Sequence, residues 1–174
     1  MDTKQRIGAR VTRQFSSSPQ RVFGAWLDSK IAGQWLFAPG QFRCAEIDLR
    51  AGGRFCFAGR RNGESVEYVG EFLETVEPHR LVFILYADKY SLDFERVTVL
   101  FHSHGAGCEL DLIHETTPEL ALQVRRDWIK VLNRLAVPLD ESSRDSRPRV
   151  AVRRGNEPIF ANVIVRNGGR RAVA

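Results

Sequence analysis

The stretch TTPELALQVRRDWIKVLNRLAV, residues 116–137, predicts one long amphipathic helix. Thr117 is suited to cap this helix, and Pro118 to its first position, where a missing N–H costs no hydrogen bond. Apolar residues then recur at spacings of three and four, which places them on one face: Leu120, Val124, Trp128, Val131, Leu132 and Leu135. A helix of about five turns with one apolar face needs a surface of matching length to cover.

The residues before this helix supply such a surface, because the pattern has period two from residue 42 onward. Val66, Tyr68 and Phe72 alternate with Glu67 and Glu71, so one face is apolar and the other polar. Short turns join the predicted strands, as expected of antiparallel neighbours. The strands are predicted at 42–50, 54–60, 65–77, 80–87, 94–103 and 107–115. The long helix is the only predicted element able to cover the sheet.

The first 40 residues add one strand and two short helices. Residues 7–15 alternate as a strand does, and a helix follows with Ser18 as its cap and Pro19 at its first position. Apolar side chains at helical spacing mark this helix and a second one that starts near Ser29 and ends before APG, residues 38–40: Val22, Phe23, Trp26, Leu27, Ile31, Trp35 and Leu36. The predicted fold class is α+β, with about seven antiparallel strands.

Composition and charge limit the range of functions. The 174 residues are 43% hydrophobic and 27% charged, which is typical of one globular domain with an appendage. The net charge of +5 lies mainly in residues 138–174, which hold 8 basic and 4 acidic side chains, against 18 and 17 in residues 1–137. Interleaved charges in the body are typical of a solvated surface and not of a nucleic-acid-binding stripe.

Membrane, secretion and disulfide signals are missing from the sequence. No apolar run reaches the roughly 20 residues of a membrane helix, and MDTKQRIGARVTRQF, residues 1–15, lacks the pattern of a secretory signal. We therefore expect a cytoplasmic protein. Cys44, Cys56 and Cys108 are odd in number and form no Cys-x-x-Cys pair, so we expect buried thiols.

Four segments, in this order, resemble the family of activator-of-heat-shock-protein-90-ATPase homologues, within the SRPBCC (START/Bet v 1-like) superfamily. They are VTRQFSSSPQRVFGAWLDSKIAGQWL (11–36), EIDLRAGGRFCF (46–57), YVGEFLETVEPHRLVF (68–83) and DWIKVLNRLA (127–136). The resemblance covers residues 7–137. It implies a helix-grip fold: a curved antiparallel sheet wrapped around the long C-terminal helix, with a cavity between them that often holds a hydrophobic ligand.

The chain departs from the family at one position, because members commonly have Gly-Trp where this sequence has Asp127-Trp128. An exposed aspartate there should matter little, whereas a buried one would block the close approach of a strand or partner. We assign residues 1–137 to the family domain and residues 138–174 to a basic C-terminal extension.

Two motifs suggest chemistry that their context does not favour. Gly52-Gly53 lacks the spacing of a phosphate-binding loop and precedes a strand, so we expect a turn in which both glycines adopt positive φ. In HSHGAGC, residues 102–108, His102 and His104 share a strand face and Cys108 could lie beside them, but a fourth zinc ligand is not evident. No metal and no cofactor is predicted.

His114 is the most informative titratable residue. Period two places it on the same face as Leu110 and Leu112, near the mouth of any cavity. There it is either a buried histidine held by one hydrogen bond or an acid, base or ligand donor. No nucleophile or carboxylate pair accompanies it.

We expect the cavity to be lined mainly by aromatic side chains, with the Tyr68 hydroxyl available to orient a ligand. A filled core is the alternative. The predicted cavity residues are Trp26, Trp35, Phe55, Phe57, Tyr68, Phe72, Phe83, Leu112, His114 and Trp128.

The extension reads as a linker over 138–148 followed by a possible β-arm over 149–166, which could pair with a sheet edge and join two chains as a homodimer. A disordered basic tail is the alternative.

Three functions remain. The first is a non-catalytic helix-grip domain that binds a small hydrophobic molecule or a protein, and the family resemblance implies a chaperone partner and a role in stress. The second is a small cyclase or hydrolase using His114 and Tyr68, and the third is a nucleic-acid-associated module acting through the basic extension.

Overall fold

The computed structural model describes residues 6–50, 52–61, 63–86 and 94–142. Seven strands form one antiparallel sheet in the order β1-β7-β6-β5-β4-β3-β2. The strands are β1 (Ile7–Phe15), β2 (Phe42–Ile47), β3 (Arg54–Arg61), β4 (Glu64–Val76), β5 (Arg80–Tyr86), β6 (Phe94–His104) and β7 (Gly107–Thr116). The helices are α1 (Pro19–Leu27), α2 (Ser29–Trp35) and α3 (Ala121–Ser142). This confirms the predicted α+β helix-grip fold.

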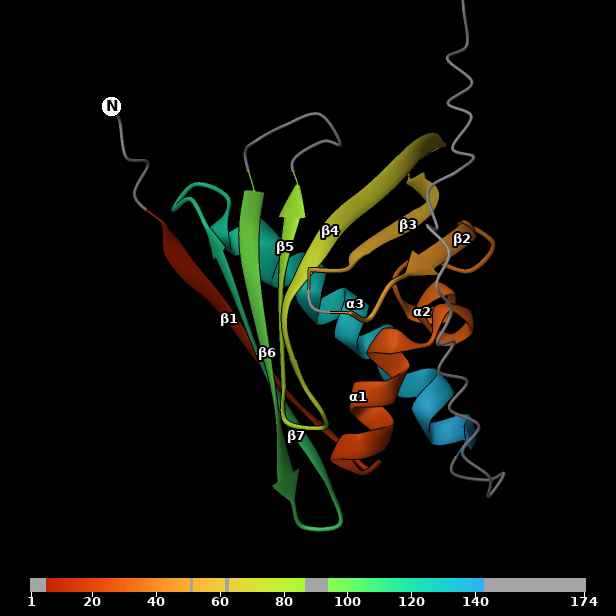
Figure 1. Ribbon diagram of the computed structural model, residues 1–174, viewed down its shortest axis with the longest axis vertical. Helices are drawn as coiled ribbons and strands as arrows, with labels where there is room; N and C mark the ends of the chain where they lie inside the picture. The colour runs from red at the N-terminus through yellow and green to blue at the C-terminus, as the bar shows by residue number, and fades with distance from the viewer. Residues whose placement is uncertain (1–5, 51, 62, 87–93, 143–174) are drawn as a thin grey trace, which may run out of the picture.

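The sheet curves around α3, which crosses it obliquely (Figure 1). Helices α1 and α2 lie on the same side of the sheet as α3 and contact the C-terminal half of α3. Helix α3 also packs against β1 and β7. All three helices therefore cover the concave face, so this face and the helices enclose the interior of the protein.

The two short helices begin as the sequence predicts, with one difference in capping. Ser18 precedes α1 and Pro19 occupies its first turn, but the Ser18 side chain makes no capping hydrogen bond. The Ser18 carbonyl instead accepts from the backbone N–H of Val22 at 3.0 Å. Asp28 both ends α1 and caps α2, because its carboxylate accepts from the N–H of Lys30 at 2.8 Å.

The long helix starts later and ends later than predicted. Residues 117–120 form a turn in which the Thr117 carbonyl accepts from the Leu120 N–H at 3.1 Å, and α3 begins at Ala121 rather than at Pro118. At the other end α3 continues through Pro138 to Ser142, so the first five residues of the predicted linker, 138–142, are helical.

Contacts with the loop before α1 explain why the helix continues past residue 137. Leu139 is buried, Ser16 Oγ donates to Asp140 Oδ1 at 3.0 Å, and Ser17 Oγ donates to the Leu139 carbonyl at 3.4 Å. The rest of the predicted linker and the predicted β-arm, with the homodimer it suggested, lie outside the described residues.

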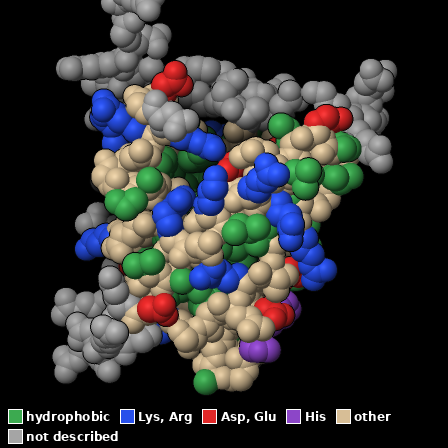
Figure 2. Space-filling model, turned by 180° about the vertical axis from the view of Figure 1, so that it is seen from behind, with side chains coloured by type: hydrophobic (Ala, Val, Ile, Leu, Met, Phe, Trp, Pro, Cys, Tyr) green, Lys and Arg blue, Asp and Glu red, His purple; other side chains and the backbone are tan. Residues whose placement is uncertain are grey.

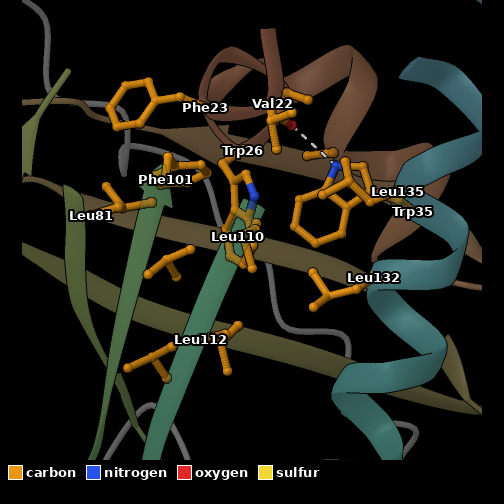
Figure 3. Packing of buried hydrophobic residues seen from close by; sticks show 14 of the residues in the cluster. Val22, Phe23, Trp26, Trp35, Leu81, Phe101, Leu110, Leu112, Leu132 and Leu135 are labelled. Atoms are coloured by element: carbon orange, nitrogen blue, oxygen red, sulfur yellow. Dashed lines mark hydrogen bonds between the residues drawn. The ribbon is translucent and has the colours of Figure 1, made fainter. Parts of the chain in front are cut away.

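The core packs between the concave face of the sheet and the helices (Figure 3). Phe101, Leu110 and Leu112 project from β6 and β7 toward Leu132 and Leu135 of α3, and all five are fully buried or nearly so. Each such side chain contributes about 1.5–3 kcal/mol by leaving water. Trp35 Nε1 donates to the Ala25 carbonyl at 3.1 Å, which ties α2 to α1 (Figure 3).

The Gly52-Gly53 turn forms as predicted, but the two glycines are required for different reasons. Gly52 has a φ of +72°, a conformation that favours glycine. Gly53 does not have positive φ. A Cβ at Gly53 would lie 2.2 Å from the Asp48 carbonyl oxygen, so it is lack of space that excludes a side chain there. Strand β3, and not a helix, follows the turn in the chain.

The three cysteines differ in exposure. Cys108 is buried, and burial raises the pKa of its thiol to about 11. Cys56 is half-buried, whereas Cys44 is exposed on the edge strand β2, so the prediction of a buried thiol is wrong there. His102 and His104 are exposed, and no three His, Cys, Asp or Glu side chains in the described ranges are placed to hold a metal ion together.

The surface seen from behind in Figure 2 carries several Lys and Arg side chains, separated by hydrophobic and other side chains. No helix in the described part of the chain is both long enough and apolar enough to cross a membrane.

Candidate ligand-binding cavity

A cavity of about 190 Å³ lies between α3 and the concave face of the sheet. Strands β3, β4 and β5 form one wall, α3 forms the opposite wall, and α1 and α2 close one side. The sixteen lining residues are Trp26, Trp35, Leu36, Phe55, Phe57, Arg61, Tyr68, Phe72, Leu81, Phe83, Leu85, His114, Val124, Asp127, Trp128 and Val131.

Nine of the ten residues predicted from the sequence line this cavity. The exception is Leu112, which is fully buried in the core but is not part of the cavity wall. The face that carries Leu110, Leu112 and His114 is the concave one, as period two predicts.

Sequence reasoning missed seven lining residues: Leu36, Arg61, Leu81, Leu85, Val124, Asp127 and Val131. The signals were present. Leu81 and Leu85 share the period-two face of Phe83, and Val124 and Val131 stand four and three residues from Trp128 on the helix. Arg61 shares the face of Phe55 and Phe57, but the strand was predicted to end one residue before it.

Aromatic rings packed against one another form much of the wall. The ring centroids of Trp26 and Trp35 lie 4.8 Å apart, and Trp128 of α3 stacks on Trp26 at 5.9 Å with an interplanar angle of 27°. On the sheet, the Phe55 ring packs against Phe72 at 5.0 Å. Gly70 of β4 makes room for Phe55, because a Cβ there would lie 2.2 Å from the Phe55 ring. These contacts fix the rings around the empty space.

His114 joins β6, β7 and α3 through two hydrogen bonds. Trp128 Nε1 donates to His114 Nδ1 at 2.9 Å, and His114 Nε2 lies 2.8 Å from Glu95 Oε2. Thr116 Oγ1 donates to the other Glu95 oxygen at 2.5 Å. Because an indole N–H can only donate, Nδ1 must be the acceptor. The proton of the neutral ring therefore sits on Nε2 and is donated to Glu95.

This geometry keeps His114 neutral. Burial lowers the pKa of His114 from its ordinary value of 6.5, and the nearby Glu95 carboxylate offsets this only in part. A second proton would have to enter at Nδ1, where it would face the Trp128 N–H. Both ring nitrogens are thus occupied, by two hydrogen bonds rather than the one expected.

The mouth of the cavity is polar. Arg61 Nη2 lies 3.3 Å from Asp127 Oδ2, and Gln123 Nε2 donates to Asp127 Oδ1 at 3.0 Å. The neighbouring Tyr68 hydroxyl and, to a smaller extent, the Asp127 carboxylate raise the pKa of the Arg61 guanidinium. The side chains of Arg61 and Asp127 are 55% and 32% exposed, so water reaches this end. Asp127, at the position where family members commonly have glycine, therefore reaches across the mouth to β3.

Arg134 of α3 holds the C-terminal end of α2. Its Nε donates to the Trp35 carbonyl at 2.8 Å and its Nη2 to the Leu36 carbonyl at 3.2 Å, which satisfies carbonyl groups at the end of α2. Burial lowers the pKa of Arg134, and the nearby Tyr68 and Asp127 oppose that effect.

Comparison with solved structures supports the fold. An X-ray structure of a protein from Nitrosomonas europaea has a TM-score of 0.68 and 15% identity, covering 83% of this chain and 99% of that one. A protein of unknown function from Staphylococcus aureus gives 0.69 and 14%, covering 82% and 99%. The solution NMR structure of the AHSA1-like protein from Aeromonas hydrophila gives 0.67 and 20%, covering 83% and 99%. At these identities the likeness establishes the fold alone.

The family is established by sequence. No curated protein matches the chain. Residues 16–140, most of the chain and nearly all of its described part, match the family described as activator of Hsp90 ATPase homolog 1-like protein. The chain therefore belongs to the activator of Hsp90 ATPase homologue 1-like family.

Proposed function

We propose that this protein is a non-catalytic binding protein that holds a small apolar ligand in the cavity beneath α3. The observation that carries the proposal is the cavity itself, whose volume of about 190 Å³ is bounded mainly by aromatic and aliphatic side chains. Apolar cavities with a few polar groups at one end are typical of small-molecule sites.

The inner part of the cavity favours an apolar ligand because its polar groups, apart from Trp26 Nε1, are already paired. Trp35 Nε1 donates to a backbone carbonyl, and Trp128 Nε1 donates to His114. Trp26 Nε1 is buried and has no hydrogen-bond partner among the described residues. A polar ligand would lose its hydrogen bonds to water there and regain at most one of them.

The volume indicates the size of the ligand. An engineered apolar cavity of about 150 Å³ binds one benzene ring, so the present cavity suits a body of one or two rings whose polar end reaches the open mouth. Ring faces and edges on the wall favour an aromatic body, because aromatic pairs are stabilised by about 0.5–1.5 kcal/mol beyond their burial.

Catalysis is not favoured by the contacts of the residues that the sequence suggested for it. His114 has no free lone pair, and Tyr68 lies beside the Arg61 guanidinium rather than beside a general base. A chaperone partner, a role in stress, a nucleic-acid partner for the extension and a cytoplasmic location stay predictions.

The test compares two identical substitutions on α3. Val131→Phe fills the cavity, whereas Val137→Phe changes an exposed residue that does not line it. Binding is followed by the fluorescence of the two-ring probe 1-naphthylamine. We expect the wild-type protein and Val137→Phe to bind the probe alike, and Val131→Phe to bind at least roughly tenfold more weakly, equivalent to about 1.4 kcal/mol.

Equal binding by both variants would place the probe elsewhere and overturn the proposal. Absence of binding to the wild-type protein would overturn it as well. Urea unfolding of each variant checks that Val131→Phe is folded before its binding is interpreted.

A further inference from the structure

Apart from His114 and the indole nitrogens, the polar side chains that line the cavity stand at its mouth, and this distribution bears on the chemistry of the ligand. Arg61 and Asp127 stand at the mouth, with Tyr68 beside Arg61, whereas His114 is engaged on both ring nitrogens. A ligand held in the cavity can therefore exchange hydrogen bonds mainly at the mouth.

The Arg61 guanidinium at the mouth has more N–H donors than the neighbouring acceptors use. Asp127 uses both carboxylate oxygens, one toward Arg61 and the other toward Gln123. A guanidinium carries five N–H donors in a planar fork, and Arg61 meets Asp127 through a single 3.3 Å contact, with Tyr68 beside it. The group that the mouth lacks is an acceptor.

The charges at the mouth also favour an anion. The charge of the Asp127 carboxylate acts on the guanidinium groups of both Arg61 and Arg134. Glu64 is the register partner of Arg61 across the β3–β4 hairpin, yet the two form no ion pair within the described ranges. Asp127 is therefore the one carboxylate that pairs with Arg61 among the described residues.

We propose that the ligand is an aromatic carboxylate, with its ring system in the cavity and its carboxylate on the Arg61 guanidinium at the mouth. This inference rests on the proposed function, because it assigns a chemical class to the ligand of the same cavity. Arg61 is the residue that determines specificity, since a guanidinium matches the two oxygens of a carboxylate in a bidentate pair.

The existing Arg61–Asp127 pair is compatible with such a ligand. It is a single long contact between partly exposed side chains, and pairs of this kind are weak. The ligand carboxylate can occupy the free edge of the guanidinium while Asp127 keeps the other edge. Asp127 still repels the ligand, so Asp127→Asn should strengthen binding of the carboxylate.

The test uses two probes that differ in one group. 2-Naphthoate and 2-naphthamide have the same ring system and nearly the same shape, but only the first is an anion at pH 7. Isothermal titration calorimetry measures both dissociation constants with the full-length protein. We expect the wild-type protein to prefer 2-naphthoate by roughly tenfold, as a charge-assisted hydrogen bond predicts.

Matched variants assign the preference to one side chain. Arg61→Gln should reduce the preference to about twofold or less and leave the affinity for 2-naphthamide nearly unchanged, because its remaining polar group is neutral. Arg60→Gln is the control, since Arg60 is the exposed neighbour on the other face of β3 and does not line the cavity. Arg60→Gln should keep the full preference.

A third measurement does not depend on any variant. In the wild-type protein the preference should shrink when NaCl is raised from about 0.02 M to about 0.5 M, because salt screens charges near the surface.

The outcomes separate the two proposals. Equal affinity of the wild-type protein for both probes overturns the carboxylate assignment and leaves the apolar binding site standing. Loss of the preference in Arg60→Gln to the same extent as in Arg61→Gln would also overturn it, since general surface charge would then be responsible. If neither probe binds, both proposals fail.

Discussion

The inner end and the mouth of the cavity hold polar groups in opposite ways. At the inner end, Trp128, His114, Glu95 and Thr116 form a chain in which donors and acceptors match. The His114 and Thr116 side chains are almost fully buried, whereas Glu95 is partly exposed. At the mouth, Arg61 has more donors than its protein partners use, and the side chains there reach water.

This difference separates structural from recognition residues. A satisfied network centred on the buried His114 fixes the position of α3 against the sheet, and removing one member leaves its partner unpaired at a cost in stability. An exposed arginine with spare donors contributes little to folding but is free to meet a ligand. Changes at the inner end should therefore act on stability, and changes at the mouth on selectivity.

The largest effect is expected for Trp26→Ala. Trp26 is 5% exposed and contacts the rings of Trp35, Trp128, Phe83 and Phe101. Its truncation should lower the free energy of unfolding by about 3–5 kcal/mol, as aromatic-to-alanine changes in cores do. Phe94→Ala, at a residue 43% exposed, is the control. If urea unfolding shows the same loss of unfolding free energy in the two variants, the rings around the cavity do not stabilise the fold as proposed.

A smaller effect concerns pH and His114. Because the folded-state pKa of His114 is lowered, the unfolded chain binds a proton below about pH 6.5 that the folded protein resists. The free energy of unfolding should then fall as the pH drops below 6.5, by about 1.4 kcal/mol for each pKa unit of the shift. Glu95 and Glu115 favour protonation, whereas Arg6 opposes it.

His114→Gln tests this dependence, because glutamine cannot take up the proton. Between pH 7.5 and pH 5 the free energy of unfolding of the wild-type protein should fall more than that of His114→Gln. His104→Gln on the exposed β6–β7 hairpin is the control. Parallel pH curves for the wild type and His114→Gln would contradict the neutral assignment.

The smallest effect on stability is expected at the mouth. Arg61→Gln removes an ion pair whose side chains are 55% and 32% exposed, and such pairs contribute about 0–1 kcal/mol. The variant should unfold at nearly the wild-type urea concentration while losing its preference for 2-naphthoate. A loss of stability comparable to that of Trp26→Ala would remove the distinction between the two ends.

The sequence predicts the fold well because each element carries its own local signal. Period two marks the strands, spacings of three and four mark the helices, and Pro19 and Asp28 stand where helices begin or end. The error at the end of α3 has a physical cause, since Leu139 and Asp140 are held by Ser16 and Ser17, about 120 residues away. Local sequence carries no sign of such a contact.

The site was predictable on its apolar side and much less so on its polar side. Alternation placed the aromatic residues on the concave face, and nine of the predicted residues meet at the cavity. The Arg61–Asp127 ion pair joins β3 to α3. The hydrogen bonds of His114 join β7 to Trp128 of α3 and to Glu95 of β6. Such contacts depend on how elements pack, which periodicity does not report.

The most direct test of the binding cavity uses the tryptophans as reporters. The chain has three tryptophans, Trp26, Trp35 and Trp128, and all three line the cavity. Each gives an indole N–H signal in a ¹H–¹⁵N NMR spectrum. Titration with 2-naphthamide should shift the three indole signals together, with one dissociation constant, while exposed backbone signals such as that of Val137 stay in place. Binding that leaves all three indole signals unmoved would contradict a ligand site beneath α3.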